Sequence, residues 1–185
     1  MGLRNTANEY GSLARWLHWL VAIGMVAIIY LGLTQAGMDR GPEKQEMRVI
    51  HGSIALIVLV LMTIRIVWRF MNDVPAHPEG VPGWQRAAAT LVHWGIYAAV
   101  FVQLVSGPIT VATGDRAISF FGLFSFSLPV EVTDENHHFW EEIHEFTWKI
   151  IAVLLVVHVL AAVYNHVVLK NDVLRRMTTG TRQDG

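Results

Sequence analysis

The sequence contains no cysteine among its 185 residues. This absence excludes disulfide bonds, iron–sulfur clusters held by thiolates, and covalently attached c-type haem, which needs a C-x-x-C-H segment. Charged residues are also scarce, at 16%, whereas hydrophobic residues make up 53% and the mean hydropathy is +0.40. A water-soluble helical bundle needs a polar stripe on each helix, and long stretches of this chain have none. The net charge of −1 provides no overall basic character, so we expect no nucleic-acid partner.

Four long apolar runs dominate the rest of the sequence. They cover approximately residues 13–37, 47–70, 86–112 and 141–170. Each contains about 20 or more residues, which is enough for a helix to cross a hydrocarbon core of about 30 Å. We therefore predict an all-α integral membrane protein, a four-helix transmembrane bundle in which residues 1–185 form a single domain. A cleaved signal peptide is the alternative for the first run, but that run exceeds the apolar length of about 7–15 residues expected of one.

The charged residues divide unevenly between the two sides of such a bundle. An even number of spans places both chain ends on one side, and nine of the fourteen basic residues fall on that side. The positive-inside rule therefore predicts cytoplasmic termini. The outer side carries ten of the fifteen acidic residues and a net charge of −5. The nine basic residues are Arg4, Arg15, Arg65, Arg69, Arg86, Lys170, Arg175, Arg176 and Arg182. The outer side has Arg40, Lys44, Arg48, Arg116 and Lys149, with Asp39, Glu43, Glu46, Asp115, Glu131, Asp134, Glu135, Glu141, Glu142 and Glu145.

Two connections have a distinctive composition. Residues 73–84 (DVPAHPEGVPGW) are rich in proline and glycine and indicate a cytoplasmic turn region. Residues 113–136 contain four phenylalanines, so we expect either a lid on the outer membrane surface or an aromatic-rich interfacial loop. Acidic residues and histidines follow at the end of the second connection. We expect them to form the N-terminus of a helix capped by Asp134 or Asn136, and a surface metal site is the alternative interpretation.

Two histidines of the fourth run predict a pair of sites at different depths. His144 and His158 are 14 residues apart, a rotation of roughly 1400° that falls about 40° short of four full turns, so both face the same way. Along the helix axis they are separated by roughly 21 Å. His166 shares this face but would lie about 33 Å from His144, beyond the hydrocarbon thickness. One histidine is therefore expected near each membrane surface.

Histidines of the other runs match these two depths. His51 lies about one turn inside the second run at the outer side, where it matches His144, and His18 matches His158 at the cytoplasmic side. Ionisable residues inside a membrane are costly and usually functional. We expect each pair to bind one b-type haem through both axial positions. Two axial imidazoles leave iron no open position, which favours electron transfer over oxygen binding.

Further residues near these pairs are candidates for contacts with the haem propionates. Arg15 and Arg48 each precede a histidine of the pairs by three residues and share its helix face, and Arg65 follows His51 by 14. Guanidinium groups bind carboxylates well, although interfacial snorkelling is the alternative reading. His93, in the third run, lies at the depth of the inner pair and could compete for iron. We expect it to contact a propionate or another helix instead.

Seven segments, in order along nearly the whole chain, resemble the bacterial cytochrome b561 family of small four-helix dihaem membrane proteins. They are W-L-H-W-L at 16–20, I-H-G-S at 50–53, L-V-H-W-G-I-Y at 91–97, I-S-F-F-G at 118–122, I-H-E at 143–145, V-H-V-L-A-A at 157–162 and K-N-D-V-L-R-R-M at 170–177. The resemblance implies a place in the bacterial inner membrane, two haem b groups, and ligands at His18, His51, His144 and His158. It also implies electron exchange with membrane quinone, ubiquinone or menaquinone.

The expected function is thus electron transfer between a periplasmic donor and the quinone pool. At least one family member looks to oxidise superoxide, but the acidic outer face of this chain favours a cationic periplasmic redox protein over an anion. Related cytochromes serve larger enzymes, so a haem-anchoring subunit of a respiratory dehydrogenase is one alternative. A haem-free transporter or proton relay is another, although transporters usually show interrupted helices and repeats.

Overall fold

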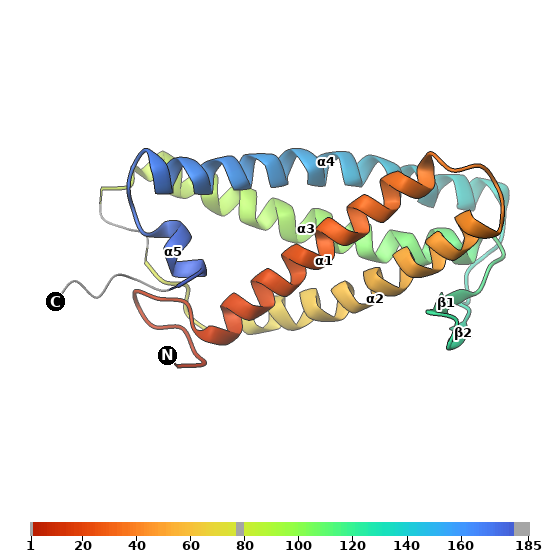
Figure 1. Ribbon diagram of the computed structural model, residues 1–185, viewed down its shortest axis with the longest axis horizontal. Coiled ribbons are helices and arrows are strands. Elements are labelled where there is room, and N and C mark those ends of the chain that lie inside the picture. The colour runs from red at the N-terminus through yellow and green to blue at the C-terminus, as the bar shows by residue number, and fades with distance from the viewer. Residues whose placement is uncertain (1, 77–79, 180–185) are drawn as a thin grey trace.

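The computed structural model describes residues 2–76 and 80–179, which form four long helices, one small hairpin and a short terminal helix (Figure 1). The elements, in chain order, are α1 (Ser12–Ala36), α2 (Pro42–Phe70), α3 (Gly83–Thr113), β1 (Ile118–Phe120), β2 (Phe124–Phe126), α4 (Asp134–Val167) and α5 (Val173–Met177). Helices α1 to α4 are each long and apolar enough to cross a membrane. The predicted all-α transmembrane bundle is therefore confirmed.

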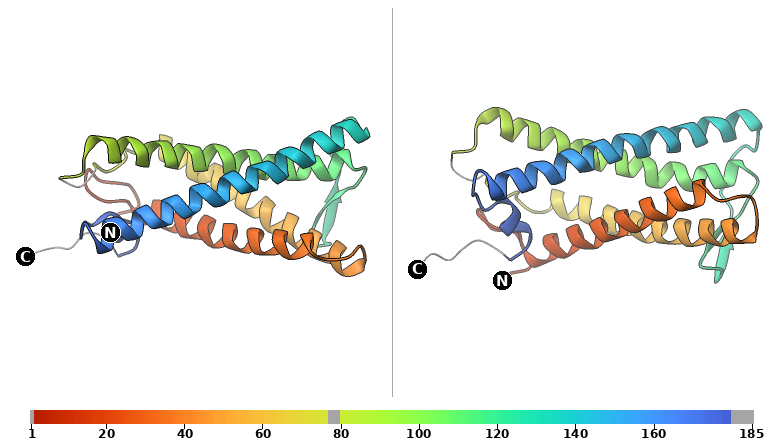
Figure 2. Two further views of the ribbon diagram at one scale, coloured as in Figure 1. Left: turned by 90° about the horizontal axis from the view of Figure 1, so that it is seen from above. Right: turned by 45° about the horizontal axis from the view of Figure 1, so that its top comes forward.

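The bundle has two chemically different ends. Helices α1 and α5 bring the described start and finish of the chain to one end, called here the termini end (Figure 1). The β1–β2 hairpin lies at the other, called the hairpin end. Helix α1 packs closely on α2, and α3 on α4, while contacts between α2 and α3 join the two pairs (Figure 2). Every membrane-spanning helix therefore presents residues to both ends.

Four helix boundaries differ from the predicted ones by three or more residues, namely the starts of α2, α3 and α4 and the end of α4. Helix α2 begins at Pro42, five residues before the predicted start, because proline is well tolerated in the first turn, where its missing N–H costs nothing. Helix α4 begins at Asp134 and ends at Val167. Its N-cap is Thr133, not Asp134 or Asn136, and the Thr133 side chain accepts a hydrogen bond of 3.2 Å from the Asn136 amide.

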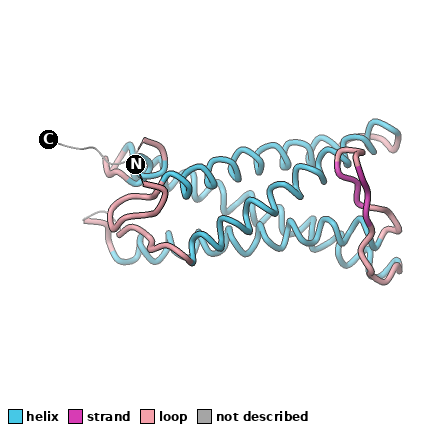
Figure 3. The backbone as a smooth tube through the Cα atoms, turned by 90° about the horizontal axis from the view of Figure 1, so that it is seen from below, coloured by secondary structure: helices cyan, strands magenta, loops and turns pink. Residues whose placement is uncertain are grey.

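The β-hairpin between α3 and α4 was not predicted. Ile118 pairs with Phe126 in an antiparallel register, and the turn passes through Phe121 and Gly122, with φ of 49° and 73°. The amide of Phe121 donates a 2.7 Å hydrogen bond to Oγ of Ser53 on α2. The hairpin thus lies across the hairpin end of the bundle rather than extending away from it (Figure 3). Strands of three residues are too short to give a periodic sequence signal.

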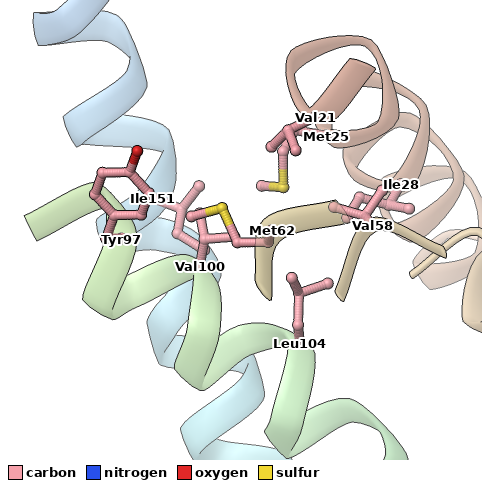
Figure 4. Close-up of a cluster of buried hydrophobic side chains, with 9 residues drawn as sticks. All are labelled: Val21, Met25, Ile28, Val58, Met62, Tyr97, Val100, Leu104 and Ile151. Carbon is pink, nitrogen blue, oxygen red and sulfur yellow. The ribbon is translucent and has the colours of Figure 1, made fainter. Parts of the chain in front are cut away.

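A layer of apolar side chains fills the middle of the bundle. Its buried members come from all four long helices, and Figure 4 shows them converging on one another. They are Val21, Met25, Ile28, Val58, Met62, Tyr97, Val100, Leu104 and Ile151. The outward faces of the same helices expose valine, leucine and isoleucine, as expected where lipid rather than water is the solvent.

Loop residues at the termini end are joined by hydrogen bonds between distant segments. The Asn5 side chain donates to the Asp73 carbonyl at 2.8 Å, and the Ala76 amide donates to the Ala7 carbonyl at 2.9 Å. Trp19 Nε1 donates to the Met177 carbonyl at 2.8 Å. These bonds attach the start of α1 to the α2–α3 connection and to α5. Residues 77–79, in the middle of the predicted turn region 73–84, lie outside the described residues, as does Arg182.

Candidate functional site

The histidines predicted to act together lie in two layers, one on each side of the apolar core. His51 of α2 and His144 of α4 belong to the hairpin end, where they are near enough to interact electrostatically. His18 of α1, His93 of α3 and His158 of α4 lie at the termini end. Each layer is assembled from different helices, so neither exists until the bundle has formed. The apolar middle layer separates them.

The termini-end layer contains three imidazole rings in close proximity. The ring centroids of His18 and His158 are 6.2 Å apart, with an interplanar angle of 68°. Metal–imidazole bonds are about 2 Å long, so two ligands on opposite faces of one iron place their ring centres roughly 6 Å apart. The spacing of His18 and His158 suits such a pair. His93 is nearer to His158, with 5.2 Å between centroids, so it also lies within this layer.

Arg65 is the arginine that accompanies the termini-end histidines. Its charge lies close to both His18 and His158. Its Nε donates a 3.0 Å hydrogen bond to the Tyr97 hydroxyl, and a terminal nitrogen donates to the Ala14 carbonyl at 3.3 Å. These two bonds hold the guanidinium in place beside the imidazoles. A fixed positive charge inside an apolar bundle is suited to an anionic group such as a carboxylate.

The other two predicted arginines have different surroundings. Arg15 is buried, and one of its terminal nitrogens donates to the Thr178 carbonyl at 3.3 Å, so it contacts the segment after α5. Arg48 is exposed at the hairpin end and lies near Arg116. Burial lowers the pKa of Arg116, the charge of Arg48 lowers it further, and Glu141 opposes both effects. The two arginines therefore form a local positive area at an end that is otherwise rich in acids.

His144 is held by two polar side chains of α3. Its Nε2 lies 2.9 Å from Gln103 Nε2, and its Nδ1 lies 3.1 Å from Ser106 Oγ. The ring also packs against Gly107, where an added Cβ would approach His144 Cε1 to 3.1 Å. His51 packs in the same way against Gly32 of α1, where an added Cβ would lie 3.2 Å from Cε1. Both imidazoles therefore depend on a close approach between neighbouring helices.

The hairpin-end residues fit a b-type haem. His51 Nδ1 is buried without a well-formed hydrogen bond among the described residues, although the backbone of Ile28 is nearby. No set of three or more His, Cys, Asp or Glu residues in 2–76 and 80–179 is arranged to hold a free metal ion. A pair of histidines suits a metal that already has four equatorial donors, as iron in porphyrin does. The termini-end pair satisfies the same requirement.

Sequence reasoning missed Gln103, Ser106 and Tyr97. The signal for the first two was present, because an amide and a hydroxyl interrupt the apolar run of α3, and polar residues within a membrane usually have a function. Their partner was not visible, because it belongs to α4 and is 38 to 41 residues away in the sequence. Tyr97 looked like one more aromatic residue, and its bond to Arg65 depends on the packing of α2 against α3.

Comparison with known proteins gives consistent matches over nearly the whole chain. The family model described as prokaryotic cytochrome b561 matches residues 9–180. Cytochrome b561 homolog 1 of Escherichia coli (strain K12) is 30% identical, over 92% of this chain and 97% of the relative. Cytochrome b561 homolog 2 of the same organism is 27% identical, over 100% and 98%. The probable superoxide oxidase CybB of Yersinia pestis is 25% identical, over 91% and 95%.

Proposed function

Because the chain belongs to the prokaryotic cytochrome b561 family, whose members are membrane proteins that transfer electrons through b-type haem, we propose that it carries two haems and passes electrons from one membrane surface to the quinone pool. The observation that supports this most strongly is the division of the histidines into two layers separated by an apolar core. An electron carrier that spans a membrane needs one redox centre near each surface. A single layer would serve only one side.

In this proposal two histidines would hold each haem. His51 and His144 hold the haem at the hairpin end, and His18 and His158 hold the one at the termini end. When bound, haem iron accepts and releases one electron at a time. Arg65 binds a propionate of the termini-end haem, while Arg15, Arg48 and His93 are further candidates for propionate contacts.

The apolar middle layer keeps the two sites separate. Aliphatic side chains and two methionines, Met25 and Met62, occupy the centre of the bundle. Apart from the Tyr97 hydroxyl, which is bonded to Arg65, the side chains of this layer in the described part of the chain are apolar and do not replace the hydration of water or ions. The layer therefore keeps the two sites apart while electrons pass between them.

The orientation follows from the charges. We place the termini end on the cytoplasmic side of a bacterial inner membrane and the hairpin end in the periplasm, with residues 1–185 acting as one transmembrane domain. The lipid bilayer surrounds the apolar faces of α1 to α4. Ubiquinone or menaquinone, dissolved in that bilayer, would accept electrons at the termini end. A periplasmic donor supplies them at the hairpin end.

Reoxidation by quinone tests this assignment. Purified protein, reduced anaerobically, is mixed with a soluble ubiquinone analogue while haem absorbance is followed. Rapid reoxidation of both haems is expected, with two electrons and two protons converting each quinone to quinol. If both haems are present but no reaction occurs, the chain is instead a haem-anchoring subunit of a larger respiratory dehydrogenase. If the purified protein is colourless, it is a histidine-lined transporter or proton relay.

A further inference from the structure

The hydroxyl of Ser106 lies in a fully buried position against the imidazole of His144. Its relative exposure is 0%, and Oγ is 3.1 Å from His144 Nδ1. The same oxygen donates a hydrogen bond of 3.2 Å to the Gln103 carbonyl. A hydroxyl has only one proton to donate. When that proton goes to the carbonyl, Ser106 Oγ accepts from His144, and this is the arrangement that an iron bound at Nε2 requires, because the proton of the neutral imidazole is then on Nδ1.

A second contact, from the Gln103 amide, matches the same tautomer, although Oε1 of that amide is buried without a hydrogen-bond partner among the described residues. The Gln103 side-chain amide nitrogen, which can only donate, lies 2.9 Å from His144 Nε2. With the amide in this orientation His144 Nε2 presents a lone pair, as a neutral imidazole protonated at Nδ1 does. That lone pair is the one an iron atom would take in place of the Gln103 amide. Ser106 and Gln103 thus prepare His144 to bind metal through Nε2.

The corresponding nitrogen of His51 lacks this arrangement. Its Nδ1 is buried and makes no well-formed hydrogen bond among the described residues. Both imidazoles pack against a glycine of the neighbouring helix, at Gly32 and Gly107, so their steric surroundings are alike. The difference between the two ligands lies in the hydroxyl partner. His144 has a side-chain hydroxyl at its Nδ1, whereas the group near His51 is the backbone of Ile28.

We propose that Ser106 is a positioning residue for His144, which fixes its Nδ1–H tautomer and sets the reduction potential of the hairpin-end haem. A ligating imidazole that donates its other N–H to an oxygen is held in orientation and becomes a stronger donor to the metal. A stronger donor stabilises ferric over ferrous iron and lowers the potential. This inference rests on the proposed function, because it requires haem at His51 and His144.

The test is a redox titration of the purified holoprotein with Ser106→Ala, followed by optical and electron paramagnetic resonance spectroscopy. The hairpin-end haem is identified as the one missing from His144→Ala. Its potential should rise in Ser106→Ala by the equivalent of about a tenfold shift in the ferric–ferrous equilibrium, about 59 mV for one electron. Its ferric low-spin signal should shift as well, while the termini-end haem is unchanged. A mere packing role for Ser106 would not move these quantities selectively.

Thr110→Val is the matched control. It removes a hydroxyl from the next turn of α3, which donates to the Ser106 carbonyl at 2.9 Å. It should leave both potentials in place. Ser106→Ala with two haems and unaltered potentials would overturn the inference.

If Ser106→Ala loses the hairpin-end haem, a second variant, Ser106→Cys, decides between the explanations, because a thiol is a weak acceptor of similar size. Retention of that haem with an intermediate potential supports positioning by the hydrogen bond, and loss in both variants contradicts it. Wild-type protein without haem would contradict the proposed function instead.

Discussion

Arg65 is the single residue whose charge most directly affects the termini-end site. It lies near both His18 and His158 and is held by the Tyr97 hydroxyl. A positive charge close to a haem favours the reduced iron, which has one positive charge fewer. Arg65→Gln should therefore lower the potential of the termini-end haem, by on the order of a tenfold change in its redox equilibrium, about 59 mV.

The control for this prediction lies one turn further along α2. Arg69 has its guanidinium 5.4 Å from the centre of the Trp94 ring, and its charge is not among those that act on His18 or His158, whereas that of Arg65 is. Arg69→Gln should change the potential much less than Arg65→Gln. Spectroelectrochemical titration of the two variants provides the comparison. Equal shifts in both would show that Arg65 acts only as part of a diffuse surface charge.

His93 has a different expected role from the ligands beside it. It is nearest to His158, and its neighbours already include the His18–His158 pair at a spacing that suits one iron. His93→Gln should retain two haems per chain, because an amide still forms hydrogen bonds at this position. A moderate change in the potential of the termini-end haem is expected. A pyridine haemochrome assay that finds only one haem in this variant would make His93 a ligand and displace His18 or His158.

The sequence predicted the histidines better than it predicted their supporting residues. Helical spacing and depth are properties of one helix, so His144 and His158 can be compared before anything is known of packing. Gln103 and Ser106 acquire their meaning only when α3 lies against α4. Arg15 was predicted from its spacing to His18, whereas its contact with the Thr178 carbonyl depends on where the chain returns after α4.

At the level of whole helices, close approach depends on glycine. Because Gly107 has no side chain, the ring of His144 can pack against α3. An alanine Cβ at position 107 would lie 3.1 Å from Cε1 of His144, which is closer than ordinary van der Waals contact. Gly107→Ala should therefore displace the imidazole and weaken retention of the hairpin-end haem. The termini-end haem should remain. Haem content and its loss during detergent washing are the quantities to measure.

Gly52→Ala is the matched control, because a Cβ at that position meets nothing within 4 Å. The substitution adds the same methyl group beside His51, and alanine is the better helix former by about 1 kcal/mol. Both haems should remain in this variant. If Gly107→Ala behaved like Gly52→Ala, the close contact of α3 with His144 would not matter for the site.

Helix existence was predictable from the sequence, while helix ends and the hairpin were not. Long apolar runs define the four spans, because each must satisfy its own backbone hydrogen bonds in lipid. The polar first turns of α2 and α4 lie outside those runs, so hydropathy placed their starts too late. The hairpin depends on Ser53, which is on another element and supplies the acceptor for Phe121.

For the molecule as a whole, the uneven distribution of charge predicts the kind of electron donor. The ten acidic residues of the hairpin end are all exposed, although Glu145 is paired with Lys149 at 2.9 Å and Glu142 with His138 at 3.3 Å. Such a surface attracts cations and changes encounter rates by about tenfold or more. A cationic periplasmic redox protein should reduce the haems quickly at low salt and more slowly as salt shortens the Debye length to about 8 Å.

Superoxide provides the contrasting case, since it is an anion. The relative from Yersinia pestis is named a probable superoxide oxidase, and Arg48 with Arg116 forms a local positive area in this chain. The net charge of the outer side nevertheless predicts slow reduction by superoxide. Stopped-flow measurements across a range of ionic strength distinguish the two donors. Fast reduction by superoxide that declines with added salt would show attraction of the anion and contradict this prediction.

The measurement that tests the account most directly is the number of haems per chain in four alanine variants. Purified wild-type protein should contain two haem b groups. His51→Ala and His144→Ala should each lose the same haem, and His18→Ala and His158→Ala should each lose the other, as judged by haemochrome content and by which redox potential disappears. If all four variants retained two haems, or if the losses did not fall into these two pairs, the two-layer assignment of the histidines would be wrong.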